Sequence, residues 1–195
     1  MGTHMTYRIG YLVGSLSSTS INRQLSEVLI RLAPPQLRFT EIPIGALPLF
    51  SPDLEATMPS AASEFKQAVA SSDGLLIVSP EYNRSIPGAL KNAIDWGSRP
   101  SGDNSFARKP TGIIGASKGN IGTAVMQSSM RSVLSFLDAP QLNSPEAYIT
   151  FRPEVFPGGG VVTDESTERF LTRYMSEYAA FVERVLAVNA PGHIG

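Results

Sequence analysis

The sequence predicts an α/β fold in which an open, doubly wound parallel sheet carries helices on both faces, giving three layers. Two observations lead to this prediction. Apolar, strand-like runs alternate with segments whose apolar residues recur at helical spacing along the whole chain. The strongest strand signal, residues 74–80, has no polar alternation, as is typical of a parallel strand covered on both faces. The chain has 195 residues, 42% of them hydrophobic, which suits one domain with a real core.

The first part of the pattern contains three strands and two helices. A proline pair, Pro34 and Pro35, stops the first helix. A proline-rich loop then extends through Pro59, and Ser60 is a possible cap of the second helix. Strands are expected at 8–14, 37–42 and 74–80, and helices at 21–32 and around 65–69.

The second part of the pattern adds two strands and three helices. The fifth strand is the weakest signal, because two short segments share it. No repeat or domain boundary is visible, so residues 5–195 are expected to form a single domain. The third helix is expected at about 87–96 with Pro87 in its first turn, the fourth strand at 111–115, the fourth helix at 121–137, the fifth strand region at 140–142 and 148–151, and the last helix at 171–185.

Composition excludes several classes of function. Lysine and arginine number 16 against 17 aspartate and glutamate, so a basic nucleic-acid-binding surface is not expected. There are no cysteines, which removes disulfides, iron–sulfur clusters and a cysteine nucleophile, and leaves redox chemistry to a bound organic cofactor. No apolar run approaches the ~18 residues of a membrane span and no signal peptide is visible, so a cytoplasmic protein without a membrane partner is expected.

The histidines offer little to a metal site or a catalytic triad. Residues 1–4 precede a second methionine, Met5, and are interpreted as a remnant of cloning, which sets His4 aside. His193 stands in a proline- and glycine-flanked tail and is expected to be a solvated residue. We therefore expect no metal centre built on histidine.

Ligands of doubly wound sheets bind at the carboxyl ends of the strands, which directs attention to three loops at 14–22, 79–88 and 115–122. The first has neither the glycine pattern of a dinucleotide site nor a Walker motif. It is a hydroxyl-rich turn that leads into a helix, where free amides and the helix dipole attract an anion such as a phosphate monoester. The plainer interpretation is a serine-rich turn with Ser20 as the helix cap.

The other two loops have the chemistry to hold a planar group. In the second, Pro80 and Pro87 limit the conformations of a segment that can present backbone amides, the Asn83 amide and the Tyr82 ring. Its alternative is an ordinary turn with a surface pair between Glu81 and Arg84. The third loop consists mainly of small residues and glycines, which let the backbone approach a ligand closely. The alternative interpretation is a flexible, glycine-rich connector. Its Lys118 could lie near a developing negative charge.

Together these segments resemble the NADPH-dependent FMN reductase family, which includes bacterial chromate, quinone and azo reductases. The resemblance covers nearly the whole chain, and the stretch that carries it most specifically runs from Pro80 to Trp96. It implies a flavodoxin-like sheet of five strands in the order 2-1-3-4-5. The matching segments are Gly14-Ser15, Ser20-Ile21-Asn22, Pro80-Glu81-Tyr82-Asn83-Arg84-Ser85-Ile86-Pro87-Gly88-Ala89-Leu90-Lys91-Asn92-Ala93-Ile94-Asp95-Trp96 and Gly115-Ala116-Ser117.

The resemblance also implies the cofactor, the reaction and the site. FMN would be bound and would receive a hydride from NADPH or NADH, then reduce a small-molecule acceptor such as a quinone, a flavin, an azo compound or chromate. Such enzymes are commonly homodimers or homotetramers. The implied cofactor-binding residues are Ser15, Ser17, Ser20, Ile21 and Asn22 around the phosphate, Pro80, Glu81, Tyr82, Asn83 and Arg84 at the ring loop, and Ser117 and Lys118 on the other side.

Two points qualify what the resemblance implies. The family often has an arginine where Ser17 stands, so the preference between NADPH and NADH is not determined, although Arg23 is close in sequence. The alternative function is a flavodoxin-type electron carrier without a substrate of its own, which would share the fold and the phosphate site. Near-neutral charge and the match from Pro80 to Trp96 favour the enzyme.

Overall fold

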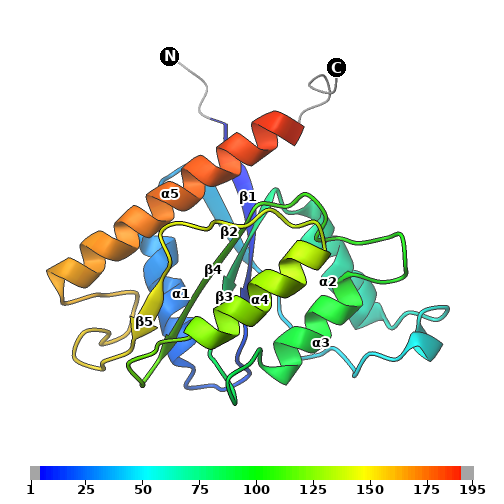
Figure 1. Ribbon diagram of the computed structural model, residues 1–195, viewed down its shortest axis with the longest axis horizontal. Coiled ribbons are helices and arrows are strands. Elements are labelled where there is room, and N and C mark those ends of the chain that lie inside the picture. The colour runs from blue at the N-terminus through cyan, green and yellow to red at the C-terminus, as the bar shows by residue number, and fades with distance from the viewer. Residues whose placement is uncertain (1–4, 190–195) are drawn as a thin grey trace.

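The computed structural model describes residues 5–189 (Figure 1). The remnant at residues 1–4 and the tail residue His193 lie outside the described residues. Five strands alternate with five helices, as the sequence predicted, and the proline-rich loop also contains one short 3₁₀ helix. The elements are β1 (Tyr7–Val13), α1 (Ile21–Leu32), β2 (Leu37–Glu41), η1 (Pro52–Leu54), α2 (Ser60–Ser71), β3 (Gly74–Val78), α3 (Gly88–Gly97), β4 (Thr111–Ser117), α4 (Ala124–Phe136), β5 (Tyr148–Thr150) and α5 (Glu165–Asn189).

The strands form one parallel sheet in the order β2-β1-β3-β4-β5, which confirms the flavodoxin-like prediction. Helices α1 and α5 cover one face, and α2, α3 and α4 cover the other (Figure 1). Strand β3 lies at the centre, and all five of its residues are buried. Leu76 and Val78 contribute to the core under α1 and α5, while Leu75 and Ile77 contribute to the other core. This double burial explains why the strand shows no polar alternation in the sequence.

The fifth strand is interrupted, as its two weak segments suggested. Gln141 forms a bridge with Thr111, and the pairing with β4 resumes only at Tyr148. Between these points a helix residue supplies the missing donor, because the Tyr174 hydroxyl of α5 donates to the Ile113 carbonyl at 2.9 Å. The Tyr174 side chain of α5 therefore provides the hydrogen bond to β4 that the interrupted fifth strand does not provide.

A second buried tyrosine fixes α5 to the centre of the sheet. Tyr178 is 0% exposed, and its hydroxyl donates to the Leu75 carbonyl at 2.8 Å. Room for its ring depends on a glycine, since a Cβ on Gly112 would lie 2.9 Å from the ring. Burial raises the pKa of Tyr178, so the phenol remains a hydrogen-bond donor at ordinary pH.

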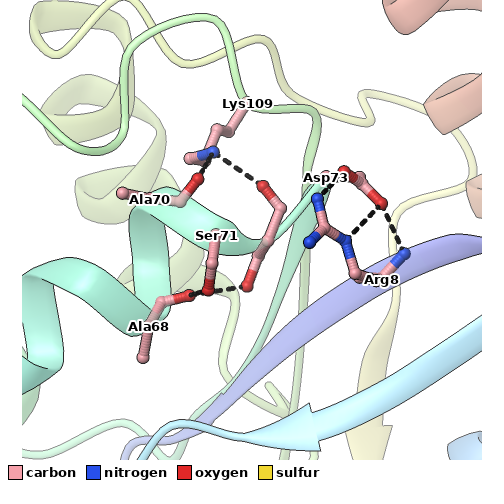
Figure 2. Close-up of polar contacts among 7 residues, drawn as sticks. Arg8, Ala68, Ala70, Ser71, Asp73 and Lys109 are labelled. Atoms are coloured by element: carbon pink, nitrogen blue, oxygen red, sulfur yellow. Dashed lines mark hydrogen bonds and ion pairs between the residues drawn. The ribbon is translucent and has the colours of Figure 1, made fainter.

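Charged side chains form hydrogen bonds at the end of the sheet where the strands begin (Figure 2). The Arg8 guanidinium donates to the Asp73 carboxylate at 2.9 and 3.2 Å, and the Arg8 backbone N–H donates to it at 2.7 Å. Lys109 caps the end of α2 by donating to the carbonyls of Ala70 at 2.9 Å and Ser72 at 2.7 Å. Burial by itself would raise the pKa of Asp73, but the hydrogen bonds and charge of Arg8 outweigh it and lower that pKa below 3.8.

Three helices begin one to three residues away from the predicted positions. Helix α4 begins at Ala124 rather than at 121, because Gly122 adopts a left-handed φ of 62° that a helix does not accommodate. Ser60 is the first helical residue of α2 and not its cap, since extended Pro59 takes the cap position. Pro87 likewise precedes α3 in an extended conformation instead of forming its first turn.

The last helix, α5, is longer than its apolar pattern indicated. Asp164 defines its start, because its carboxylate accepts hydrogen bonds from the Thr167 backbone N–H at 2.8 Å and from two hydroxyls. Those bonds lower the pKa of Asp164 to about 2. Within residues 5–189, no helix combines the length and the apolarity that crossing a membrane requires.

Candidate functional site

The three loops singled out in the sequence converge at the carboxyl end of the sheet. They surround a hollow of about 300 Å³. Asn83 and Arg84 do not line it, whereas every other candidate residue does, together with Thr19 and Ala116. The lining residues are Ser15, Ser17, Thr19, Ser20, Ile21, Asn22, Pro80, Glu81, Tyr82, Ala116, Ser117 and Lys118.

The serine loop is held in shape by its own hydroxyls. The Ser15 Oγ accepts from the Ser17 N–H at 3.3 Å, and the Ser17 Oγ accepts from the Thr19 N–H at 3.2 Å. The Ser20 Oγ accepts from the Arg23 N–H at 3.3 Å, which confirms Ser20 as the cap of α1. The first N–H groups of α1, at Ile21 and Asn22, have no acceptor inside the helix and carry the positive end of its dipole. Hydroxyls and amides of this kind suit a phosphate dianion.

Asn22 has a structural partner that the sequence did not reveal. Its side chain is 1% exposed, and its Nδ2 donates to the Ala116 carbonyl at 2.9 Å. Its Oδ1 accepts from the Ala116 N–H at 2.8 Å. The side-chain amide thus ties the start of α1 to the end of β4, and the group it leaves for a ligand is its backbone N–H.

Tyr82 reaches from the second loop to the first. Its hydroxyl lies 3.4 Å from the Ser15 Oγ, and the residue is 49% exposed. Its hydroxyl therefore joins the donors of the serine loop, in addition to the aromatic surface expected from its residue type. No signal in the sequence linked these two loops at this point.

The tip of the second loop is a tight turn. Tyr82 and Ser85 exchange backbone hydrogen bonds of 3.1 and 3.0 Å, and the two residues between them have positive φ, 51° at Asn83 and 62° at Arg84. This is the pattern of a type I′ turn. Asparagine tolerates the left-handed conformation, whereas arginine adopts it at a cost of about 1–2 kcal/mol. Such strain is found where the surroundings fix the backbone.

Glu81 makes more than the surface pair with Arg84 that the sequence suggested. The pair is present, with 3.4 Å between Arg84 Nη1 and Glu81 Oε1. The other carboxylate oxygen accepts from the backbone N–H groups of Val125 and Met126, each at 3.0 Å. The Glu81 side chain is 9% exposed and lies against the start of α4. Its residue type alone could not show this, because the donors are backbone groups more than 40 positions along the chain.

The third loop is shaped by two glycines. A Cβ on Gly115 would lie 2.1 Å from the Ser79 carbonyl oxygen, and one on Gly122 would lie 2.7 Å from the Tyr148 backbone. The Ser117 hydroxyl turns back onto Gly119, donating to its carbonyl at 3.1 Å and accepting from its N–H at 3.2 Å. The loop is thus constrained by close backbone approaches, which the flexible-connector alternative would not require.

Charge around the hollow is arranged for an anion. Lys118 is exposed and has no ion pair among residues 5–189. Arg23, the candidate substitute for the family arginine, is paired elsewhere, because its Nη1 and Nη2 each donate to the Glu41 carboxylate at 2.8 Å. Its hydrogen bonds lower the pKa of Glu41. The carboxylate that lines the hollow, Glu81, is already matched by the amides of α4 and by Arg84. The residues present therefore fit a bound phosphate monoester.

The fold defines a flavodoxin-like protein, and the hollow formed by the three loops lies at the edge where sheets of this kind bind their ligands. Comparison with known proteins identifies the family. The model of the NADPH-dependent FMN reductase family matches residues 7–154. The 2-hydroxy-1,4-benzoquinone reductase of Burkholderia sp is 47% identical over 178 residues, which cover 91% of this chain and 97% of that protein. The quinone reductase of Pseudomonas putida is 40% identical over 183 residues, covering 93% of this chain and 98% of that protein.

Among solved structures, FerB from Paracoccus denitrificans, a flavoenzyme NAD(P)H:(acceptor) oxidoreductase, superposes with a TM-score of 0.89. It is 39% identical, and the match covers 92% of this chain and 98% of that chain. The chain belongs to the NADPH-dependent FMN reductase family. It is therefore an oxidoreductase that uses FMN with NAD(P)H as the electron donor.

Proposed function

We propose that this enzyme reduces quinones with electrons from NAD(P)H, and that free flavins, azo compounds and metal oxyanions such as chromate are further acceptors. The observation that carries the proposal is the hollow at the carboxyl end of the sheet, in which the donors of three loops face a common space. Relatives named quinone reductases that match this chain over nearly its whole length support quinones as the acceptor class. We also propose a cytoplasmic location.

The serine loop is the proposed phosphate site. Ser15, Ser17 and Ser20 offer hydroxyls, and Ile21 and Asn22 offer backbone N–H groups at the start of α1. The Tyr82 hydroxyl extends this set from the facing loop. A lysine is not required, because hydroxyl and amide donors together with the helix dipole can balance a dianion.

The second and third loops are the proposed ring site. Pro80, Glu81 and Tyr82 line the hollow from the second loop, and Ser117 and Lys118 line it from the third. FMN bound there supplies the redox chemistry, and the protein contributes binding, orientation and electrostatics. Asn83 and Arg84 stand at the tip outside the hollow, where we assign them to the rim that receives the electron donor.

A homo-oligomer, dimer or tetramer, is the proposed assembly. Several apolar side chains are exposed around the carboxyl end of the sheet, which is typical of a surface that another chain covers. They are Leu16, Tyr82, Ile121 and Val125. Light scattering that gives only the chain mass of 20.9 kDa across working concentrations would contradict the assembly.

The test of the function is anaerobic mixing of FMN-loaded protein with NADPH and, separately, with NADH, followed by a benzoquinone. Bleaching of the flavin by the nicotinamide and its recovery with the quinone are expected, with ping-pong steady-state kinetics because the two substrates would use one site in turn. Reduction only by a separate reductase protein would indicate an electron carrier instead. Ser15→Asp should purify without flavin, because a carboxylate would face the phosphate.

A further inference from the structure

The contact between Glu81 and helix α4 has no place in the functions assigned so far. Glu81 comes from the loop after β3, and α4 begins at Ala124, beyond the loop after β4. The carboxylate nevertheless lies against the first turn of α4 and accepts from Val125 and Met126 at 3.0 Å each. With a side chain 9% exposed, this is a nearly buried and fully partnered carboxylate.

The Glu81 carboxylate accepts the hydrogen bonds that a capping side chain would accept at the start of helix α4. Thr123 occupies the cap position, but its hydroxyl accepts from the Gln127 side chain at 3.0 Å and caps no backbone N–H, and the first turn contains no acidic residue. The N–H groups of a first turn have no acceptor inside the helix and carry a partial positive charge. A charged acceptor from another segment satisfies two of them and complements the dipole, and bonds of this type are stronger than neutral ones.

The same bonds anchor the loop from which Glu81 comes. Immediately after Glu81 the backbone enters the strained turn at Asn83 and Arg84. Immediately before it, buried Pro80 lines the hollow. Glu81 lies between these two segments and is bonded to α4, which follows the third loop directly. Its contact therefore holds the backbone of the proposed ring site in place relative to the third loop.

We infer that Glu81 is a positioning residue, which acts through helix α4 and not by a contact of its carboxylate with the flavin. Its bonds to Val125 and Met126 fix the backbone of the second loop in the geometry that receives the flavin ring. Because the amides of α4 and Arg84 balance its charge, the carboxylate adds no free negative charge to the wall of an anion site. The inference rests on the proposed placement of FMN in this hollow.

The first test uses the flavin-free protein and amide hydrogen exchange. In Glu81→Ala, exchange at Val125 and Met126 should accelerate at least about tenfold, as expected from losing hydrogen bonds to a charged group. Glu81→Gln should stay near the wild-type rate, because its amide oxygen can still accept. Glu64→Ala, an exposed glutamate on α2, is the matched control and should leave both amides unchanged. Unchanged exchange in Glu81→Ala would overturn the inference.

The second test is FMN titration of the same variants by fluorescence. Glu81→Ala should bind FMN about tenfold more weakly, while Glu81→Gln should stay within about threefold of wild type. If Glu81→Gln lost as much affinity as Glu81→Ala while its Val125 and Met126 amides remained protected, the charge would act on the flavin directly and the inference would be wrong. Failure of the wild-type protein to bind FMN would instead contradict the proposed function, and the two failures are thereby distinguished.

Discussion

Replacing Asn22 separates a structural from a ligand-binding role for a residue that the family resemblance assigns to the phosphate. The side chain is buried, and both ends of its amide bond the backbone of Ala116, at 2.9 and 2.8 Å. Each hydrogen bond contributes about 0.5–1.5 kcal/mol, and a buried backbone group left unsatisfied costs about 1–3 kcal/mol. Asn22→Ala should therefore lower the free energy of unfolding by about 2–4 kcal/mol. For a domain of this length that corresponds to a fall in Tm of about 4–16 °C.

The measurement is urea unfolding of flavin-free protein, in which no phosphate contact contributes. Asn143→Ala is the control, because its side chain accepts from Arg131 at an exposed position and should change stability by less than about 0.5 kcal/mol. If Asn22→Ala unfolds like wild type without flavin yet loses FMN affinity, the amide serves the ligand and the structural argument is refuted.

Three further predictions follow from contacts described above. Arg84→Gly should be about 0.5–1 kcal/mol more stable than Arg84→Ala in chemical unfolding, because both lose the ion pair and glycine alone relieves the positive φ; equal stabilities would contradict the strain. The pKa of the Asp73 carboxyl is lower in the folded state than in the unfolded chain. Because the unfolded chain therefore binds a proton at higher pH, the free energy of unfolding of the wild type should decrease as the pH falls below 3.8. Asp73→Asn should be less stable at pH 7 and show a flatter acid limb, and parallel pH profiles would argue against the Arg8 contact. Tyr178→Phe should cost about 1–2 kcal/mol in thermal unfolding, since the Leu75 carbonyl loses a buried donor, and an unchanged Tm would speak against that bond.

Much of the fold was readable from local patterns. Apolar runs and helical periodicity located the strands and helices, and strand β3 showed its double burial in five consecutive apolar positions. The start of α4 was misplaced because Ile121 fits the helical spacing while Gly122 breaks the backbone conformation. Periodicity reports side-chain faces and does not report a single left-handed residue.

The sequence predicted where the candidate site lies, but it did not predict most of the contacts that hold the site together. The sequence indicated which loops meet, since the carboxyl ends of parallel strands share an edge. Ser20 could be predicted as a cap because its partner is three residues away. The partners of Asn22 and Glu81 could not, because they are backbone groups 94 and 44 positions distant and any residue type supplies them.

These two long-range contacts have a consequence for altering the acceptor range by directed evolution. Asn22 fastens the first loop to the strand that leads into the third, and Glu81 fastens the second loop to the helix that leaves the third. A library that randomises either position would disturb all three loops at once and yield mostly inactive clones. Diversity is better placed at Lys118, which is exposed and has no ion pair among residues 5–189. Lys118 lines the hollow and takes part in neither of these long-range contacts.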